Sequence, residues 1–289
     1  MPSPPVRIGA LGQKHPPVSI NQRHGRDEKH IHRPAPTATL RAVISVDLDI
    51  AVGQIAGPDF ALATAKAHVD ALKAKGLAFF NGYHVADFPS GQNQLPAELT
   101  QAVDGLAGTG GTLWLAINKV TLPLGLSMGP EYGDTVVVPQ LRQLVAYART
   151  KGVKVSLYPH AGFWAAQFET CVRVASKVDD PNLGVTFNLC HWLKVEGADR
   201  DPVPVLRAAL PRLMFVSISG ADTGDTRAMS WDRLIQPLDA GSYDVGAFLR
   251  TLRTVGYTGP VGFQGYNIKG EPRDILARSI AAWRTFNAH

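Results

Sequence analysis

The sequence has few cysteines and no long hydrophobic run. Its two cysteines, Cys171 and Cys190, lack CxxC spacing, so neither a disulfide framework nor a zinc site is predicted. No segment of about 18 uncharged apolar residues is present to span a membrane, and residues 1–17 lack the apolar stretch of a secretory signal. We therefore expect reduced thiols, no membrane partner and a cytoplasmic location.

Most of the chain also lacks any excess of positive charge. The 289 residues carry a formal net charge of +5. Residues 1–41 account for all of it, because they hold seven Lys or Arg against two Asp or Glu, and the rest of the chain has 22 of each sign. Since a nucleic acid needs a basic footprint, we expect no nucleic-acid partner for the main domain.

Residues 1–37 differ in composition from everything that follows. They contain seven of the 21 prolines and four of the nine histidines. A His-rich tract can bind metal, but so little apolar content favours an extension that does not pack. We therefore predict two parts, a basic, Pro- and His-rich extension at residues 1–37 and one folded domain at residues 38–289.

Strand-like and helix-like segments alternate along the folded domain. Strands are predicted at residues 6–12, 48–52, 77–83, 112–117, 153–157, 184–187, 213–218 and 259–263. Helices are predicted at residues 60–75, 96–106, 136–150, 165–178, 202–210, 244–255 and 272–286, with only residues 37–46 available for a first helix. Eight strands with intervening helices predict a (β/α)8 TIM barrel whose first βα unit is short or irregular. A doubly wound open sheet is the alternative, but no GxGxxG or GxxxxGK[ST] loop supports it.

Barrel enzymes place their chemistry at the carboxyl ends of the strands. Neutral amides, hydroxyls and histidines dominate there, and carboxylates are nearly absent. The side chains concerned are Asn81, Tyr83, His84, Asn118, Lys119, Tyr158, His160, Asn188, Cys190, His191, Trp192, Ser217, Ser219, Gln264, Tyr266 and Asn267. Because buried polar groups are costly unless they are paired, so many of them together predict a site.

Two stretches resemble a known family, the xylose-isomerase-like barrels that include sugar phosphate isomerases and epimerases. They are DDPNLGVTFNLCHW at residues 179–192 and LDAGSYDVGAFLRTLRTVGYTGPVGFQGY at residues 238–266. The resemblance extends over roughly residues 70–286 and implies a TIM barrel that acts on sugars. In that family a divalent metal is usually held by Glu, Asp, His and Glu, and the matching positions here are Tyr158, Asn188, Ser217 and Gln264. Since none of these is a carboxylate, which hard cations require, we expect no metal and no other cofactor.

The remaining groups can still perform proton transfer. His160 and His191 follow neighbouring strands, and imidazole titrates close to neutral pH, so they are the predicted acid and base. Tyr158 is the third predicted catalytic residue, as a donor to a carbonyl or enolate oxygen. Asn188 and Gln264 are predicted to bind substrate hydroxyls, and His84 is included in the same substrate-binding set.

Aromatic and cationic side chains complete the predicted binding set. Trp164 and Trp192 each follow a strand end and are expected to face the ligand, because aromatic walls suit the CH faces of sugars. Phe163 is expected to pack in the rim instead. Lys194 and Lys269 follow the sixth and eighth strands and are predicted to neutralise an anionic substrate.

Two classes of function stay open at this point. One is an isomerase, epimerase or lyase that acts on a sugar or keto-sugar by proton transfer without the usual family metal. The other is a catalytically inactive barrel that binds a carbohydrate or serves in regulation. The retained histidine pair favours the enzyme, and the loss of carboxylates favours the inactive barrel. In both cases the expected partner is a small carbohydrate, and the sequence leaves open whether the chain forms a homo-oligomer.

Overall fold

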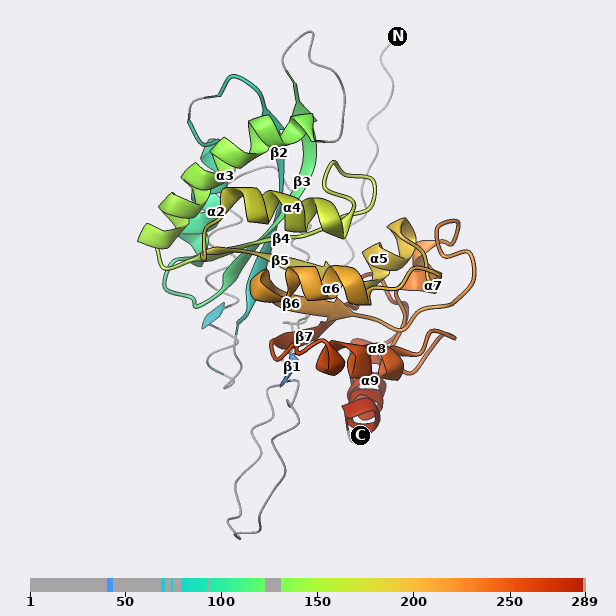
Figure 1. Ribbon diagram of the computed structural model, residues 1–289. Coiled ribbons are helices and arrows are strands. Elements are labelled where there is room, and N and C mark those ends of the chain that lie inside the picture. The colour runs from blue at the N-terminus through green and yellow to red at the C-terminus, as the bar shows by residue number, and fades with distance from the viewer. Residues whose placement is uncertain are drawn as a thin grey trace, which may run out of the picture.

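The computed structural model describes residues 41–43, 69, 70, 74, 79–92, 94–122 and 131–287. Its described strands form one parallel sheet in the order β1-β7-β6-β5-β4-β3-β2. Figure 1 shows α2, α3, α4 and α6 side by side on one face of this sheet, with α8 and α9 next to β7. Parallel strands joined by helices on one face are the arrangement that the alternating sequence pattern predicts.

The elements follow one another in the predicted order. The strands are β1 (Arg41–Val43), β2 (Asn81–Pro89), β3 (Thr112–Thr121), β4 (Lys154–Leu157), β5 (Leu183–Asn188), β6 (Leu213–Ile218) and β7 (Pro260–Phe263). The helices are α2 (Ala97–Leu106), α3 (Tyr132–Thr150), α4 (Phe168–Val178), α5 (Leu189–Val195), α6 (Val203–Ala209), the 3-10 turn η2 (Leu210–Arg212), α7 (Trp231–Leu234), α8 (Val245–Thr254) and α9 (Pro272–Asn287). In the part of the chain that the structure describes, none of these helices has the length and apolar character needed to cross a membrane.

The two faces of the sheet belong to different apolar clusters. Side chains such as Leu115, Leu157 and Phe187 join the large cluster that includes the helices. Trp114 and Phe215, on β3 and β6, belong to a separate inner cluster. Two intervening strands would separate β3 from β6 by about 14 Å in a flat sheet, yet the two rings lie 4.8 Å apart between centroids. The sheet therefore curls around the inner cluster, as the wall of a barrel does.

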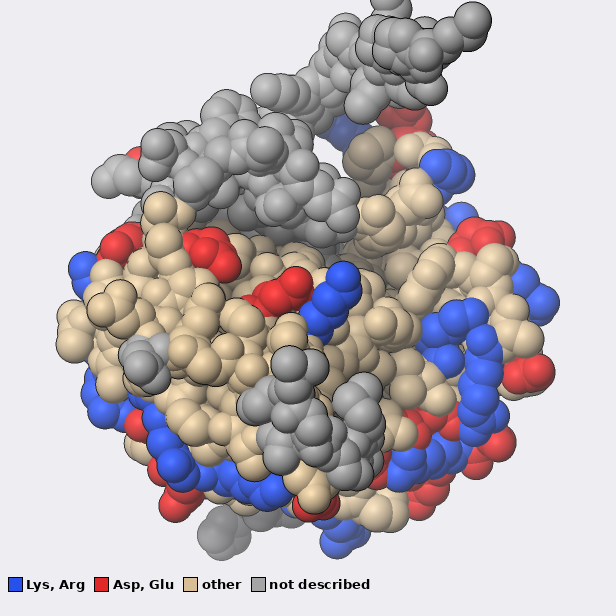
Figure 2. All heavy atoms as spheres, turned by 90° about the horizontal axis from the view of Figure 1, so that it is seen from above, with Lys and Arg blue, Asp and Glu red and all other residues tan. Residues whose placement is uncertain are grey.

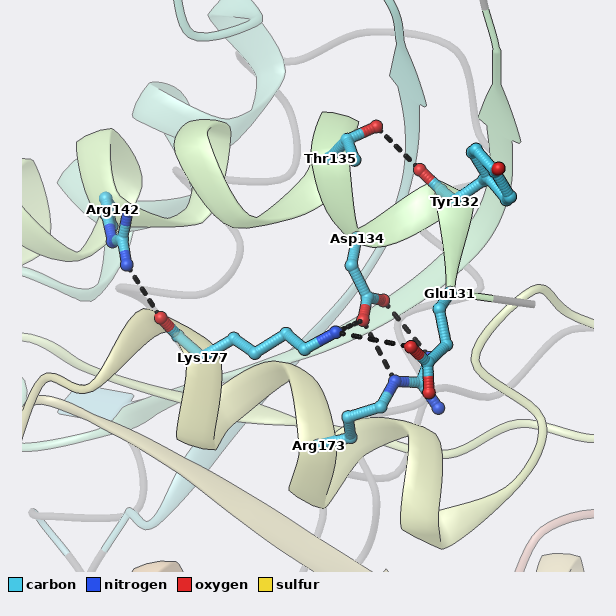
Figure 3. Close-up of polar contacts among 7 residues, drawn as sticks. All are labelled: Glu131, Tyr132, Asp134, Thr135, Arg142, Arg173 and Lys177. Atoms are coloured by element: carbon cyan, nitrogen blue, oxygen red, sulfur yellow. Dashed lines mark hydrogen bonds and ion pairs between the residues drawn. The ribbon is translucent and has the colours of Figure 1, made fainter. Parts of the chain in front are cut away.

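A buried ion cluster joins α3 to α4 (Figure 3). Asp134, near the start of α3, is 4% exposed and accepts two hydrogen bonds from Arg173, at 2.9 and 3.1 Å. Nζ of Lys177 donates a third hydrogen bond to Asp134, at 2.8 Å, and lies 3.8 Å from Oε2 of Glu131. Burial alone would raise the pKa of Asp134, but the hydrogen bonds from Arg173 and Lys177 outweigh it and leave that pKa lowered. These ion pairs tie the start of α3 to α4, so we assign this cluster a structural role.

The start of the barrel differs from the prediction. Arg41–Val43 forms β1, a strand paired in parallel with β7, within the residues 37–46 that were expected to form the first helix. β-Branched residues are frequent in that segment, and they favour strands over helices. A barrel places its first strand beside its last, so β1 occupies the place that the sequence assigned to residues 6–12. The predicted strands at residues 6–12 and 48–52 lie outside the described residues. Among the described strands, β1 and β2 are the two ends of the sheet.

Other boundaries are shifted. β2 and β3 run to Pro89 and Thr121, several residues beyond the predicted ends. Asn81, Tyr83 and His84 therefore lie in the first half of a strand rather than at its end. The helix predicted at residues 60–75 is helical at the three positions described, 69, 70 and 74. Helices α5 and α7 have no predicted counterpart, because each is too short for a helical period to show in the sequence.

Candidate functional site

The loop that follows β4 is held in place by the neighbouring strand β3. The backbone N–H groups of Tyr158, Trp164 and Ala165 donate to the carbonyls of Leu115, Asn118 and Ile117, at 2.9, 2.8 and 3.2 Å. Within the loop, the N–H of His160 donates to the carbonyl of Ala165 at 3.2 Å. A loop with this many backbone bonds positions its side chains almost as firmly as a strand does.

Asn188, the last residue of β5, links this loop to α5. Its Oδ1 accepts hydrogen bonds from the backbone N–H groups of Cys190 at 3.1 Å and His191 at 3.4 Å, so Asn188 is the N-cap of α5. Its Nδ2 donates to the hydroxyl oxygen of Tyr158. The buried amide of Asn188 therefore fixes both α5, which carries His191, and the phenol of Tyr158, directly after β4.

His160 and His191 lie side by side, with ring centroids 4.3 Å apart and ring planes tilted by 44°. Both rings bond to Ala161: its N–H donates to Nδ1 of His191 at 3.1 Å, and its carbonyl oxygen lies 3.0 Å from Nδ1 of His160. A carbonyl can only accept, so Nδ1 of His160 carries a proton. Nδ1 of His191 accepts and carries none. When both rings are neutral, Nε2 is therefore a bare acceptor on His160 and an N–H donor on His191.

The surroundings keep both imidazoles neutral. Burial lowers the pKa of His160, and the bond to Ala161 offsets only part of that effect. Burial also lowers the pKa of His191 well below its ordinary value, and the neighbouring His160 lowers it further. His191 is 5% exposed. A neutral pair with one acceptor and one donor has the protonation states that acid–base catalysis at neutral pH requires.

Aromatic rings line the inner side of the sheet beside this pair. Tyr158 stacks on Trp114 with centroids 5.2 Å apart and meets Tyr83 edge to face at 5.1 Å. Phe163 stacks on His160 at 4.0 Å and packs against the same inner cluster. Phe163 was expected to pack over the barrel rim, and its contacts with His160 and the inner cluster are packing contacts of this kind.

Gln264 and Ser217 extend the site along β6 and β7. Ser217 is paired in register with Asn188 on one side and with Gly262 on the other. Because Val261 and Phe263 belong to the helix-facing cluster, Gln264 lies on the opposite, inner face. It is 7% exposed, and its Oε1 has no hydrogen-bond partner within the described residues. A buried amide oxygen without a partner can accept a hydrogen bond from a ligand hydroxyl.

Three of the predicted binding residues face away from this site. Trp164 packs on the start of α3, where a Cβ on Gly133 would come within 2.5 Å of its indole ring. Trp192 packs on Phe187 in the helix-facing cluster and under the guanidinium of Arg200. His84 shares its strand face with Gly82 and Ala86, which contact α2 and the helix-facing cluster. Strand and helix periodicity direct His84 and Trp192 outward, and the loop after β4 turns Trp164 toward α3. The structure therefore does not bring these three side chains to the histidine pair.

The two predicted lysines have other partners. Lys194 donates to the backbone carbonyls of Arg227 at 2.8 Å and Met229 at 2.6 Å. Lys269 is exposed and donates to Oδ1 of Asn267 at 2.8 Å. Sequence reasoning missed Trp231, on α7, whose ring lies 5.2 Å from that of His191. No local signal marks this residue, because it follows β6 by 13 residues in a loop without a recognised motif.

The four positions matched to metal ligands make a poor site for a hard divalent cation. They offer a phenol, two amides and a hydroxyl, and no negative charge. The amide of Asn188 is already engaged on both sides, by Tyr158 and by the start of α5. Within the described residues no group of three or more His, Cys, Asp or Glu side chains is placed to hold a metal ion. The residues present do not fit the family's metal.

The family model for the xylose isomerase-like TIM barrel matches residues 112–286. This is more than half of the chain, and the chain therefore belongs to the xylose isomerase-like TIM barrel family. The fold predicted from the alternating segments is confirmed at this level. The β1–β7 pairing and the curled sheet agree with it.

Similar proteins include two dehydratases and an epimerase by name. The 3-dehydroshikimate dehydratases of Pseudomonas aeruginosa and Pseudomonas putida are 24% and 25% identical over 136 and 138 residues, 46% of this chain in each case. The matched part spans only 21% of each dehydratase. The 3-keto-D-glucoside 4-epimerase of E. coli superposes with a TM-score of 0.59 at 18% identity, covering 79% of this chain and 87% of its own. The IolI protein, crystallised with a zinc atom, gives a TM-score of 0.57 at 15% identity over 76% of this chain and 81% of its own. These two structural likenesses show the fold alone.

Proposed function

We propose that this protein is an enzyme that moves a proton next to the carbonyl of a small polyhydroxylated keto compound, as an isomerase, epimerase or dehydratase. The observation that carries the proposal is the His160–His191 pair, in which Ala161 imposes complementary protonation on two adjacent rings. A bare Nε2 beside an Nε2–H supplies a base and an acid without further rearrangement.

The chemistry follows from these protonation states. Nε2 of His160 removes the proton from the carbon next to the carbonyl and becomes an imidazolium, while Nε2–H of His191 donates a hydrogen bond to the carbonyl oxygen and keeps its proton. The product is an enediolate whose negative charge is balanced by the His160 imidazolium. Return of the proton from His160 to the neighbouring carbon, with transfer of that carbon's hydroxyl proton to the former carbonyl oxygen, completes an isomerisation. Delivery of a solvent proton to the opposite face of the original carbon, with loss of the His160 proton to solvent, completes an epimerisation. Departure of a hydroxyl from the next carbon as water, with the proton of the His160 imidazolium, re-forms the carbonyl and completes a dehydration.

Tyr158 and Gln264 support this step in different ways. Tyr158 accepts from Asn188, and we assign its hydroxyl the role of a donor to the developing enolate oxygen. Gln264 offers a buried acceptor for a substrate hydroxyl. No step passes through a metal, because the matched positions lack the carboxylates that such a cation requires.

The similar proteins support this choice of chemistry. Their names include an epimerase and two dehydratases, and all three reactions can begin with proton removal beside a carbonyl. The chain spans about a fifth of the length of the curated dehydratases it matches, so their substrate is one candidate among several.

A carbohydrate-binding barrel without catalysis is the second candidate. The observation in its favour is the neutral donor set at Tyr158, Asn188, Ser217 and Gln264. Such a set keeps hydrogen-bonding capacity for hydroxyls while it lacks the ligands for a hard divalent cation. The two candidates differ in one property, since only the enzyme exchanges a substrate carbon-bound proton with solvent.

Deuterium exchange tests the proposal without knowledge of the product. D-Fructose, D-allulose and 3-dehydroshikimate are incubated separately with the protein in deuterium oxide, and NMR follows the carbon-bound proton next to the carbonyl. We expect His160→Asn and His191→Asn to slow exchange by about 10²- to 10⁴-fold. Lys154→Ala, at the opposite end of β4 from Tyr158, is the matched control and should exchange like the wild type. Exchange no faster than in buffer with every probe would overturn the enzyme in favour of the binding barrel.

A further inference from the structure

Trp231 is a large apolar side chain that the fold leaves exposed although the segment carrying it is well anchored. The residue is 38% exposed. It begins α7, in the long connection between β6 and α8, and its carbonyl accepts from the N–H of Ile235 at 2.8 Å. More than a third of the indole is therefore open to a ligand, and burying it against one would be favourable.

Three sets of contacts anchor the segment around Trp231. The amino group of Lys194, on α5, donates to the carbonyls of Arg227 and Met229 just before it. The hydroxyl of Thr226 donates to the carbonyl of Leu193 at 2.6 Å. On the other side, Gly220 and Gln236 exchange backbone hydrogen bonds at 3.0 and 2.9 Å. The indole is therefore presented from a segment tied to α5 and to the end of β6.

The position of the ring relates it directly to the histidine pair. The centroids of Trp231 and His191 lie 5.2 Å apart with an interplanar angle of 70°. The ammonium of Lys194 lies 5.9 Å from the centre of the same indole, so one cation already interacts with its ring electrons. A ligand bound at His191 would lie close to this indole, because the two rings are neighbours.

We propose that Trp231 is the binding platform for the apolar CH face of the ligand at the His160–His191 pair. This inference rests on the proposed function and replaces the platform that the sequence analysis assigned to Trp164 and Trp192. A flat ring beside hydrogen-bonding groups selects a ring or chain with CH groups on one side and hydroxyls on the other. Trp231 binds and orients this ligand, and it transfers no proton.

Variants of Trp231 test the platform by separating binding from turnover. With D-fructose, D-allulose and 3-dehydroshikimate as probes, calorimetry gives Kd, and deuterium exchange gives kcat and KM. Trp231→Ala should weaken Kd and raise KM by about tenfold, with a smaller change in kcat. Trp231→Phe keeps a flat ring and should recover most of the affinity. Tyr132→Ala, which removes an exposed aromatic at the start of α3, is the matched control and should bind like the wild type.

The outcomes distinguish this inference from the proposed function. If exchange depends on His160 and His191 but Trp231→Ala leaves Kd and KM unchanged, the platform is wrong and the enzyme stands. If the wild type binds a probe without exchange and Trp231→Ala weakens that binding, the platform stands and the enzyme is wrong. A loss of affinity in Trp231→Phe equal to that in Trp231→Ala would overturn the requirement for a flat ring. Failure of the wild type to bind any of the three probes would overturn the platform as well.

Discussion

His160 and His191 come from different strand ends, yet both rings bond to the backbone of Ala161, which donates to one and accepts from the other. Their centroids lie 4.3 Å apart. Two cations at this distance would repel each other, so the pair is stable only while at least one ring is neutral. In the view of Figure 2, Lys, Arg, Asp and Glu side chains are most numerous around the edge of the molecule, and one acidic side chain lies beside one basic side chain near its centre.

The amide of Asn188 is expected to be important for stability as well as for the site. Asn188→Ala removes the cap of α5 and the donor to Tyr158, so the free energy of unfolding should fall by about 1–3 kcal/mol. Asn188→Ser keeps a capping oxygen but loses the donor to Tyr158, and should fall between the wild type and Ala. Urea denaturation measures both variants. Wild-type stability in Asn188→Ala would contradict the capping role.

The ion cluster between α3 and α4 provides a second stability test (Figure 3). Asp134→Asn keeps the shape of the side chain but leaves Arg173 and Lys177 without their shared carboxylate. Breaking a buried pair is costly, and the partial exposure of the two cations, 25% and 43%, reduces the loss. We expect a decrease of about 2–4 kcal/mol in the free energy of unfolding. Asp104→Asn, at an exposed ion pair with Lys151, is the control, and an equal effect of both changes would contradict the prediction.

Stability should decrease as the pH falls below the ordinary histidine pKa. Burial lowers the pKa values of His84, His160 and His191 from 6.5, so the unfolded chain takes up protons first. The contribution of these neutral histidines to the free energy of unfolding is present above pH 6.5. It is lost as the pH falls through their lowered folded-state pKa values. Between about pH 6.5 and about pH 5, the thermal midpoint of His191→Asn should change less than that of the wild type. Parallel decreases in the two proteins would contradict the buried neutral state of His191.

The metal content of the protein tests the interpretation of its neutral donor set. Untagged protein purified without chelator should contain no stoichiometric Mg²⁺ or Mn²⁺, because Tyr158, Asn188, Ser217 and Gln264 carry no carboxylate. Elemental analysis measures this directly. Stoichiometric Mg²⁺, Mn²⁺ or Zn²⁺ that is lost in His191→Ala would contradict the prediction and make the histidine pair part of a metal site.

The sequence by itself determined the order of the strands and longer helices from residue 81 onward, α5 and α7 excepted, and the convergence of Tyr158, His160, Asn188 and His191. Both follow from short-range rules. Apolar runs punctuated by Gly and Pro mark the elements, and parallel strands bring their carboxyl ends to one edge of a sheet. The substitution of the carboxylates at the matched family positions can likewise be read directly from the residues.

Only the tertiary structure decided which aromatic rings accompany the histidines. Trp192 is adjacent to His191 in sequence, but successive residues of a helix project about 100° apart, and the unpredicted helix α5 directs this indole to the helix-facing cluster. Trp231 lies 40 residues beyond His191 in sequence and reaches its ring through backbone contacts between distant loops. The first strand depended on its pairing with β7, across more than 200 residues. Such long-range contacts have no local signature, because their free energy arises only when the chain has folded.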